Sequence, residues 1–188
     1  MNDVQLQDWI DRWRQEYSDD DSKIAPLAGK PSLTADDLEP LFEWKYRKMW
    51  PKRKIRAMRA FPADQLAELT RRAFACPDEL GALRILTLIP QVGPAGASAI
   101  LSAHDPERFT VMDVRAIKSL ESLGCWNMEK FGSSASALGW PTYLHTCLDL
   151  ARRSMRKLRD VDRALWAAKG RDTSSVLVRG HRQRSSYG

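Results

Sequence analysis

The feature that most constrains the fold of this chain is a tight turn between two segments of helical character. The turn reads Ile89-Pro90-Gln91-Val92-Gly93, and it is followed by a segment rich in small residues, Pro94 to Ala103. The segment before the turn, Pro77 to Thr87, carries apolar residues at helical spacing. Glycine tolerates a positive φ, and we expect one at Gly93. The sequence therefore predicts two helices joined by a short hairpin.

The rest of the chain also shows helical patterns, and no convincing strand is found. Further helices are expected at Asp3 to Tyr17, from a Thr34 cap to near Trp50, from Pro62 to Phe74, from Asp113 onward, from Pro141 to Leu158, and from Asp160 to Ala168. We expect an all-α fold, a compact helical array with a central helix-hairpin-helix motif. Its predicted parts are an N-terminal helical appendage and linker (1–33), a main domain (34–169), and a basic tail expected to be mobile (170–188).

The composition limits which cellular compartment and which kinds of partner are expected. Thirty Lys and Arg against 24 Asp and Glu give a net charge of +6, which is compatible with a polyanion partner but does not require one. Cys76, Cys125 and Cys147 are scattered, which argues for a reducing compartment and against a four-cysteine iron–sulfur cluster. No run resembles a signal peptide or a membrane span, so we expect a cytoplasmic protein and no membrane partner.

A single acidic residue follows the small-residue helix. Asp113 comes after an apolar approach, Phe109 to Met112, and opens the next predicted helix. The turn, the helix after it and this aspartate together resemble the helix-hairpin-helix DNA glycosylase superfamily, whose hairpin usually reads L-P-G-V-G, over about a sixth of the chain. The resemblance implies a monomer that binds double-stranded DNA, with a modified base or an abasic site, in the nucleoid.

The hairpin is the expected DNA contact. The first N–H groups of a helix have no intrahelical partner, so a phosphate can bind to them without any reading of base sequence. The resemblance implies that the contacts come from Gln91, Val92, Gly93, Ala95 and Gly96. It also implies a monovalent cation on the main-chain carbonyls of Thr87, Ile89 and Val92, and no other cofactor. The alternative is that the small residues serve only close helix packing.

The hairpin departs from the family pattern at two positions. Gln91 replaces the first hairpin glycine, which costs about 1 kcal/mol if its φ is positive. Ala95 stands where bifunctional members carry a Schiff-base lysine, so imine chemistry is not expected there. The resemblance is therefore to the monofunctional members, which lack β-lyase activity.

Asp113 is the predicted catalytic residue. In the resembled enzymes this carboxylate stabilises the positive charge that develops on the sugar as the N-glycosidic bond breaks. The alternative is that Asp113 only caps its helix, because aspartate is a favoured cap.

Aromatic and basic residues alternate between Trp44 and Lys54. Aromatic planes can stack on an extruded base, and cations can follow phosphates. Trp44, Lys45, Trp50 and Trp126 are candidates for these roles, although a tryptophan at helical spacing is more often core. A second basic cluster is read as surface charge that could face phosphate: Arg152, Arg153, Arg156, Lys157 and Arg159. His104, His145 and His181 are dispersed, so a zinc site is not expected.

Three functions are consistent with these residues. The leading one is a monofunctional DNA N-glycosylase that acts on a damaged or unusual base. The second is a non-catalytic DNA-binding protein of the same fold. The third is a helical interaction module in which the hairpin only packs and a face carrying Trp9 and Trp13 binds a protein.

Overall fold

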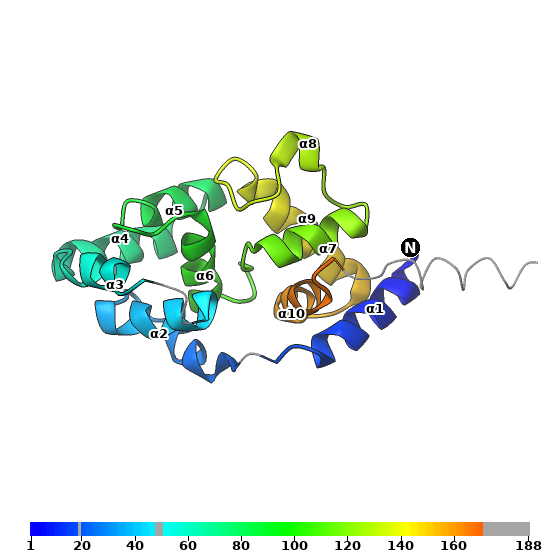
Figure 1. Cartoon of the computed structure of the whole chain (residues 1–188), viewed down its shortest axis with the longest axis horizontal. Coiled ribbons are helices and arrows are strands. Elements are labelled where there is room, and N and C mark those ends of the chain that lie inside the picture. Colours follow the sequence, from blue (N-terminus) through cyan, green and yellow to red (C-terminus); the bar gives the residue numbers. More distant parts are fainter. Residues whose placement is uncertain (19, 48–50, 171–188) are drawn as a thin grey trace, which may run out of the picture. The chain divides into compact units, whose positions relative to one another are not determined.

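The computed structural model describes residues 1–18, 20–47 and 51–170. Within these ranges all regular structure is helical and no strand is present, which confirms the all-α prediction. No helix among them is both long enough and apolar enough to cross a membrane. The helices gather into two units, the first made of residues 1–18, 113–134 and 145–170, and the second of the described residues between 19 and 112 with residues 135–144 (Figure 1).

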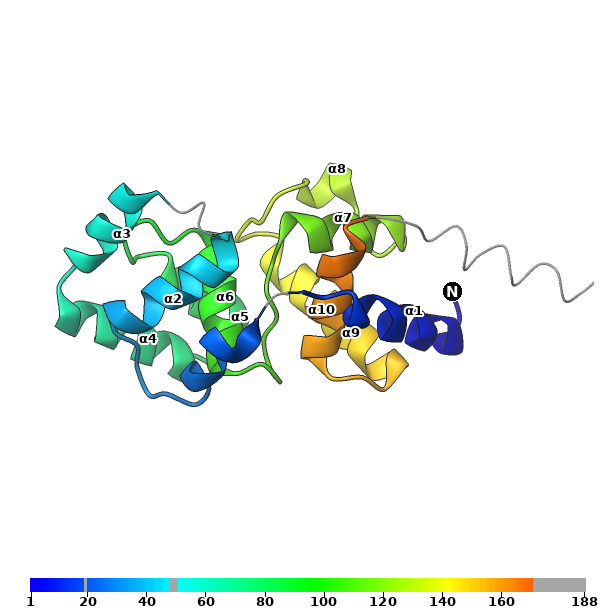
Figure 2. The same cartoon turned by 60° about the horizontal axis from the view of Figure 1, so that its bottom comes forward.

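The second unit is built around one helix, α6 (Pro94–His104). Every residue from Gly96 to Ala103 is buried, so small side chains are needed on all sides for neighbouring helices to approach. Figures 1 and 2 show α2, α4 and α5 around this helix, and all three pack against it. The other elements of the unit are η1 (Asp21–Lys23), η2 (Ala25–Leu27), α2 (Ala35–Tyr46), α3 (Lys52–Arg59), α4 (Ala63–Ala75), α5 (Glu79–Leu86) and the first residues of α9 (Trp140–Ser154).

Local signals fix where α2 begins but not where it ends. The Asp37 N–H donates to Thr34 Oγ1 at 3.3 Å, and the Thr34 N–H donates to Asp37 Oδ2 at 2.9 Å, so the predicted cap is confirmed. The helix ends at Tyr46, earlier than predicted, because Arg47 takes a left-handed conformation with φ 49°. The basic segment after Pro51 forms the helix α3, which is not among the helices predicted from the sequence.

The first unit holds the N-terminal helix as part of its core. It contains α1 (Asp3–Gln15), α7 (Val114–Ser122), α8 (Met128–Phe131), α10 (Leu158–Ala168) and the remainder of α9. Helix α1 packs along α10 and buries Leu6, Trp9, Ile10 and Trp13. The predicted apolar face is correct except for Val4, which is 68% exposed. Because Trp9 and Trp13 are buried, the prediction that their face binds a protein partner is wrong, and the segment 1–33 is shared between the two units.

The predicted helix from Pro141 to Leu158 is interrupted. Helix α9 ends at Ser154, Met155 has φ 51°, and α10 begins at Leu158. The Arg156 N–H donates to the Ala151 carbonyl at 3.1 Å and the Met155 N–H to the Arg152 carbonyl at 3.2 Å, the pattern of a Schellman helix end. A glycine usually marks such an end, and here a methionine occupies the left-handed position.

Two serines of α7 hold the C-terminal end of α10. Ser119 Oγ donates to the Leu165 carbonyl at 2.7 Å and accepts the Gly170 N–H at 2.9 Å. Ser122 Oγ lies 2.9 Å from the Lys118 carbonyl oxygen of its own helix and 3.2 Å from that of Gly170, so it also contacts the end of α10. The chain therefore leaves α10 at a fixed place beside α7.

Most arginines at the junction of α9 and α10 are paired with aspartates. Arg153 Nε lies 2.9 Å from Asp3 Oδ1, and Arg156 Nη2 lies 2.5 Å from Asp11 Oδ2. Arg152 pairs with Asp149, and Arg159 with Asp162. The second basic cluster of the sequence is thus largely neutralised within the first unit. Hydrogen bonding from Arg156 lowers the pKa of the Asp11 carboxyl below its ordinary value of 3.8.

Replacing Asp11 by asparagine is expected to lower the melting temperature at neutral pH. A carboxyl whose pKa is lowered by folding stabilises the native state above its unfolded pKa, and this contribution disappears as the pH falls through the folded pKa. The difference between wild type and Asp11→Asn should therefore be full at pH 7 and shrink below about pH 4. Asp149→Asn, in an exposed pair, is the control and should change little. A difference in melting temperature that does not depend on pH would contradict the ion-pair account.

Candidate hairpin site

The hairpin between α5 and α6 is held by its apolar residues. Ile89 and Val92 are buried, whereas Leu88, Gln91 and Gly93 are exposed. The Val92 N–H donates to the Ile89 carbonyl at 3.1 Å, which closes the turn. The two buried side chains anchor the loop, so its tip faces solvent.

The left-handed residue of the hairpin is Gln91. Its φ is 69°, at the position where the resembled family has its first glycine. Gly93 has φ −92° and ψ −178°, so the expectation of a positive φ at Gly93 is wrong. A Cβ added to Gly93 would meet no atom within 4 Å. Neither backbone conformation nor internal packing requires a glycine at this exposed position, directly before α6.

The start of α6 is left without a side-chain cap. Gly93 is the N-cap residue, and Pro94 follows it without an N–H group. The Ala97 N–H reaches the Gly93 carbonyl at 2.9 Å, whereas Ala95 and Gly96 lie too close to the helix start to have an intrahelical acceptor. This end of the helix therefore combines N–H donors with the positive end of the helix dipole.

Gly96 has a packing role. It is buried, and a Cβ at this position would lie 3.2 Å from Tyr46 Oη and 3.4 Å from Phe42 Cε1, both on α2. The close approach of α2 explains the missing side chain without a ligand. At Gly96 the structure thus favours the packing interpretation. The neighbouring Ala95 is less enclosed, since it is only half-buried.

The segment leading to Asp113 is anchored within the second unit. The Met112 N–H donates to Ser98 Oγ of α6 at 2.9 Å, and Tyr143 Oη donates to the Val111 carbonyl at 2.9 Å. Lys45 Nζ at the end of α2 lies 3.5 Å from the Met112 carbonyl oxygen. The structure therefore brings Lys45 to the residue that precedes Asp113, a proximity that the sequence did not indicate.

Asp113 caps α7. It is half-buried, and its Oδ1 accepts the Arg115 N–H at 2.8 Å, so the predicted capping role is confirmed. Asp113 is the first residue of its segment in the first unit, and the hairpin belongs to the second unit. Its catalytic role stays a prediction.

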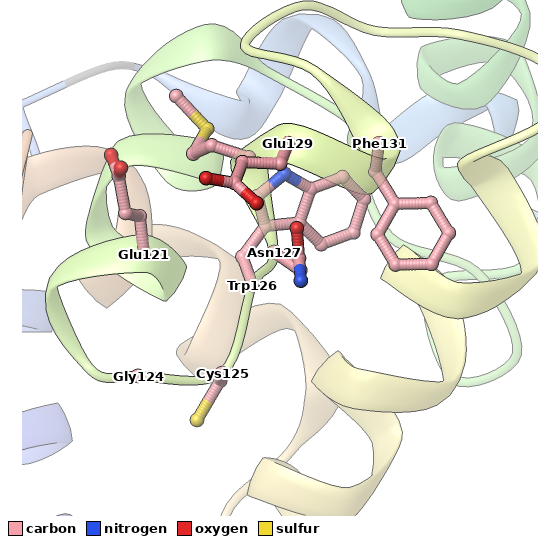
Figure 3. A pocket seen from close by; sticks show the side chains of 8 residues that line it. Glu121, Gly124, Cys125, Trp126, Asn127, Glu129 and Phe131 are labelled. Atoms are coloured by element: carbon pink, nitrogen blue, oxygen red, sulfur yellow. The ribbon is translucent and has the colours of Figure 1, made fainter.

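The predicted stacking residues have different outcomes. Trp44 is half-buried, and Trp50 lies outside the described residues. Trp126 is 7% exposed, and its Nε1 donates to the Gly132 carbonyl at 3.0 Å, so packing explains it. Its ring lies 5.0 Å from that of Phe131, at the wall of an open hollow in the first unit (Figure 3). The hollow is also lined by Glu121, Gly124, Cys125, Asn127, Met128 and Glu129.

The hollow offers carboxylates and a thiol but no strong nucleophile. Burial raises the pKa of the Cys125 thiol, which lowers its thiolate fraction at neutral pH. Among the residues that the structure describes, no group of three or more His, Cys, Asp or Glu could hold a metal ion. The hairpin carbonyls of Thr87, Ile89 and Val92 belong to one turn, and that of Ile89 already accepts an N–H. A monovalent cation on them stays a prediction.

Helix α3 adds strong positive charge to the second unit. Arg59 pairs with Asp36 and Glu39. No carboxylate among the described residues pairs with the other four cations of this helix, which are Lys52, Arg53, Lys54 and Arg56. The sequence showed these charges, but only the helix shows that Arg53 and Arg56 share one exposed face.

The backbone of the hairpin predicts opposite outcomes for two substitutions at one position. Gln91→Gly removes the strain of a side chain at positive φ, which stabilises the folded state. Glycine also gives the unfolded chain more freedom, which opposes this gain. The free energy of unfolding should therefore stay unchanged or rise by up to about 1 kcal/mol. Gln91→Val should destabilise, because β-branched residues tolerate this region poorly. Gly93→Ala is the control and should be nearly neutral. Urea denaturation of the three variants measures the differences, and a stable Gln91→Val variant would contradict the left-handed turn.

Comparison of the chain with protein-family models, with curated proteins and with solved structures finds no match. The case for a functional hairpin therefore depends on the residues and geometry of the chain itself. These are the left-handed Gln91, the uncapped start of α6 and the anchored segment before Asp113.

Proposed function

We propose that this protein binds double-stranded DNA through the hairpin and α3, and that it is a monofunctional DNA N-glycosylase. The observation that carries the proposal is the start of α6, which is exposed at Gly93, uncapped, and preceded by a left-handed residue where the resembled family has a glycine. A phosphate can bind at such a helix end because no side-chain cap occupies its first N–H groups.

The binding mode follows from the two sources of positive charge in the second unit. The N–H groups of Gly93 and Ala95 donate to phosphate oxygens, and the unpaired cations of α3 attract the phosphate backbone. Neither source reads bases. Affinity should therefore depend strongly on salt and weakly on sequence.

Asp113 is the proposed catalytic carboxylate. Its carboxylate is held at the start of α7 by the hydrogen bond that Oδ1 accepts from the Arg115 N–H. As the bond between the base and C1′ of the sugar breaks, the electrons leave with the base, and the fixed carboxylate stabilises the cationic sugar. Water then adds to C1′, and the proton that it loses passes through solvent to the departed base, so the products are the free base and an abasic sugar. Ala95 has no amine, so an imine with the sugar cannot form at that position.

A non-catalytic DNA-binding protein is the second candidate. The cap between Asp113 and Arg115 favours it, because helix capping alone accounts for an aspartate at this position. The contribution of α3 to binding is the same for both candidates, and base excision separates them.

Removing two charges from α3 is expected to weaken DNA binding for all sequences alike. In Arg53→Gln/Arg56→Gln, the slope of log affinity against log salt should become less steep by about two, since each lost phosphate contact changes it by about one. The control is Arg71→Gln/Arg152→Gln, which removes the same charge from two arginines that pair with Glu68 and Asp149. Fluorescence anisotropy with a labelled duplex measures both. If the two double variants bind equally well, α3 is not a DNA contact.

The substitution Asp113→Asn is expected to abolish base excision and to leave DNA binding intact or tighter. Asparagine keeps the capping oxygen but removes the charge, so single-turnover excision should slow by on the order of a hundredfold or more. The assay is a panel of duplexes that each contain one modified base. Near-normal turnover by the variant would refute the proposed mechanism. Duplex binding by the wild type without excision of any base would favour the non-catalytic candidate.

A further inference from the structure

A second group of cations lies in the first unit, where α7 meets the end of α10. Arg115 Cζ lies 4.5 Å from the ring centroid of Trp166, and Lys169 Nζ lies 5.7 Å from it. Lys118 is one helical turn after Arg115, and its Cβ would lie 3.1 Å from a Cβ placed on Gly170. We call Arg115, Lys118 and Lys169, grouped around Trp166, the α7–α10 cluster.

The charges of this cluster are not neutralised. Among the residues that the structure describes, none of the three has a carboxylate oxygen within 4 Å of its side-chain nitrogens. Asp113 accepts the backbone N–H of Arg115 and not its guanidinium. The cluster thus differs from the arginines around α9, which pair with aspartates. Lys118 and Lys169 are exposed, so an external anion can reach them.

The backbone that carries the cluster is held in place before any ligand binds. Ser119 and Ser122 fix the end of α10 against α7. The Trp166 ring that supports Arg115 packs edge-on against Tyr17, at 5.3 Å between centroids. Nη1 of Arg115 is buried and has no hydrogen-bond partner among the described residues, so this guanidinium retains a donor that is not used within the protein. Because the backbone is already ordered, binding through these cations costs no ordering of the chain that carries them.

We propose that the α7–α10 cluster is a contact for the phosphate backbone of double-stranded DNA within the first unit. This rests on the proposed function for the identity of the polyanion. Asp113 begins the helix that carries Arg115 and Lys118, and five residues of helix span about 7.5 Å, close to two nucleotide steps of a duplex. Phosphates held by the cluster therefore lie within a few nucleotides of the proposed catalytic carboxylate. Arg115, Lys169 and Tyr17 surround the Trp166 ring, so it is poorly suited to insertion into a lipid surface.

The test compares two double variants of the full chain with equal charge. Lys118→Gln/Lys169→Gln alters the cluster. Arg12→Gln/Lys130→Gln alters two exposed cations elsewhere in the first unit, on α1 and α8. Binding to an abasic-site duplex is measured by anisotropy over a salt series, and circular dichroism confirms that each variant is folded. Cluster loss should make the salt slope less steep by about two and weaken binding at least tenfold at low salt, with little change in the control.

The outcomes separate this proposal from the proposed function. If wild type binds the duplex and both double variants bind alike, the cluster assignment is overturned while the hairpin contact stands. If wild type does not bind the duplex at all, the proposed function fails first and the cluster assignment fails with it. Binding to phosphatidylcholine vesicles containing phosphatidylserine is measured in parallel. Vesicle binding that the cluster variant loses, with duplex binding unchanged, would overturn the proposal in favour of a membrane surface.

Discussion

The second unit depends on the close packing of α6 with its neighbours. A helix with eight consecutive buried residues must present small side chains in several directions, and Gly96 allows Phe42 and Tyr46 of α2 to approach. The same helix supplies Ser98, whose hydroxyl accepts the Met112 N–H. The packing of α6 therefore also fixes the chain segment that leads to Asp113. Small residues in this helix serve packing first, and exposure is found only just before it, at Gly93.

Local hydrogen bonding explains which parts of the fold could be predicted. The helix caps at Thr34 and at Asp113 each join residues no more than three positions apart, and the sequence predicts both. The sequence does not predict the end of α9, because Met155 takes a left-handed conformation at a position where a glycine usually marks a helix end. For the same reason the positive φ of the hairpin was placed at Gly93 and not at Gln91. The sequence shows the positive charges of α3, but it does not indicate that this segment is a helix.

The candidate site was predictable only where its parts are close in sequence. The hairpin and Asp113 were found by spacing, whereas the approach of Lys45 to Met112 joins residues far apart in the chain. Burial also lies beyond the sequence, since Trp126 carries the same pattern whether it stacks on a base or packs against Phe131. The pairing of Arg153 with Asp3 and of Arg156 with Asp11 has the same cause, because about 145 to 150 residues separate the partners.

The packing of α1 on α10 has a consequence for synthesis. Helix α1 leaves the ribosome before α10, the helix against which the segment carrying Trp9 and Trp13 packs, and 142 residues separate the end of the first from the start of the second. A contact between such distant parts of a chain forms slowly, because a long loop must close before the contact stabilises the fold. The nascent chain thus carries an uncovered tryptophan face until α10 has been synthesised. Such exposed apolar surface invites aggregation or chaperone binding until α10 is available.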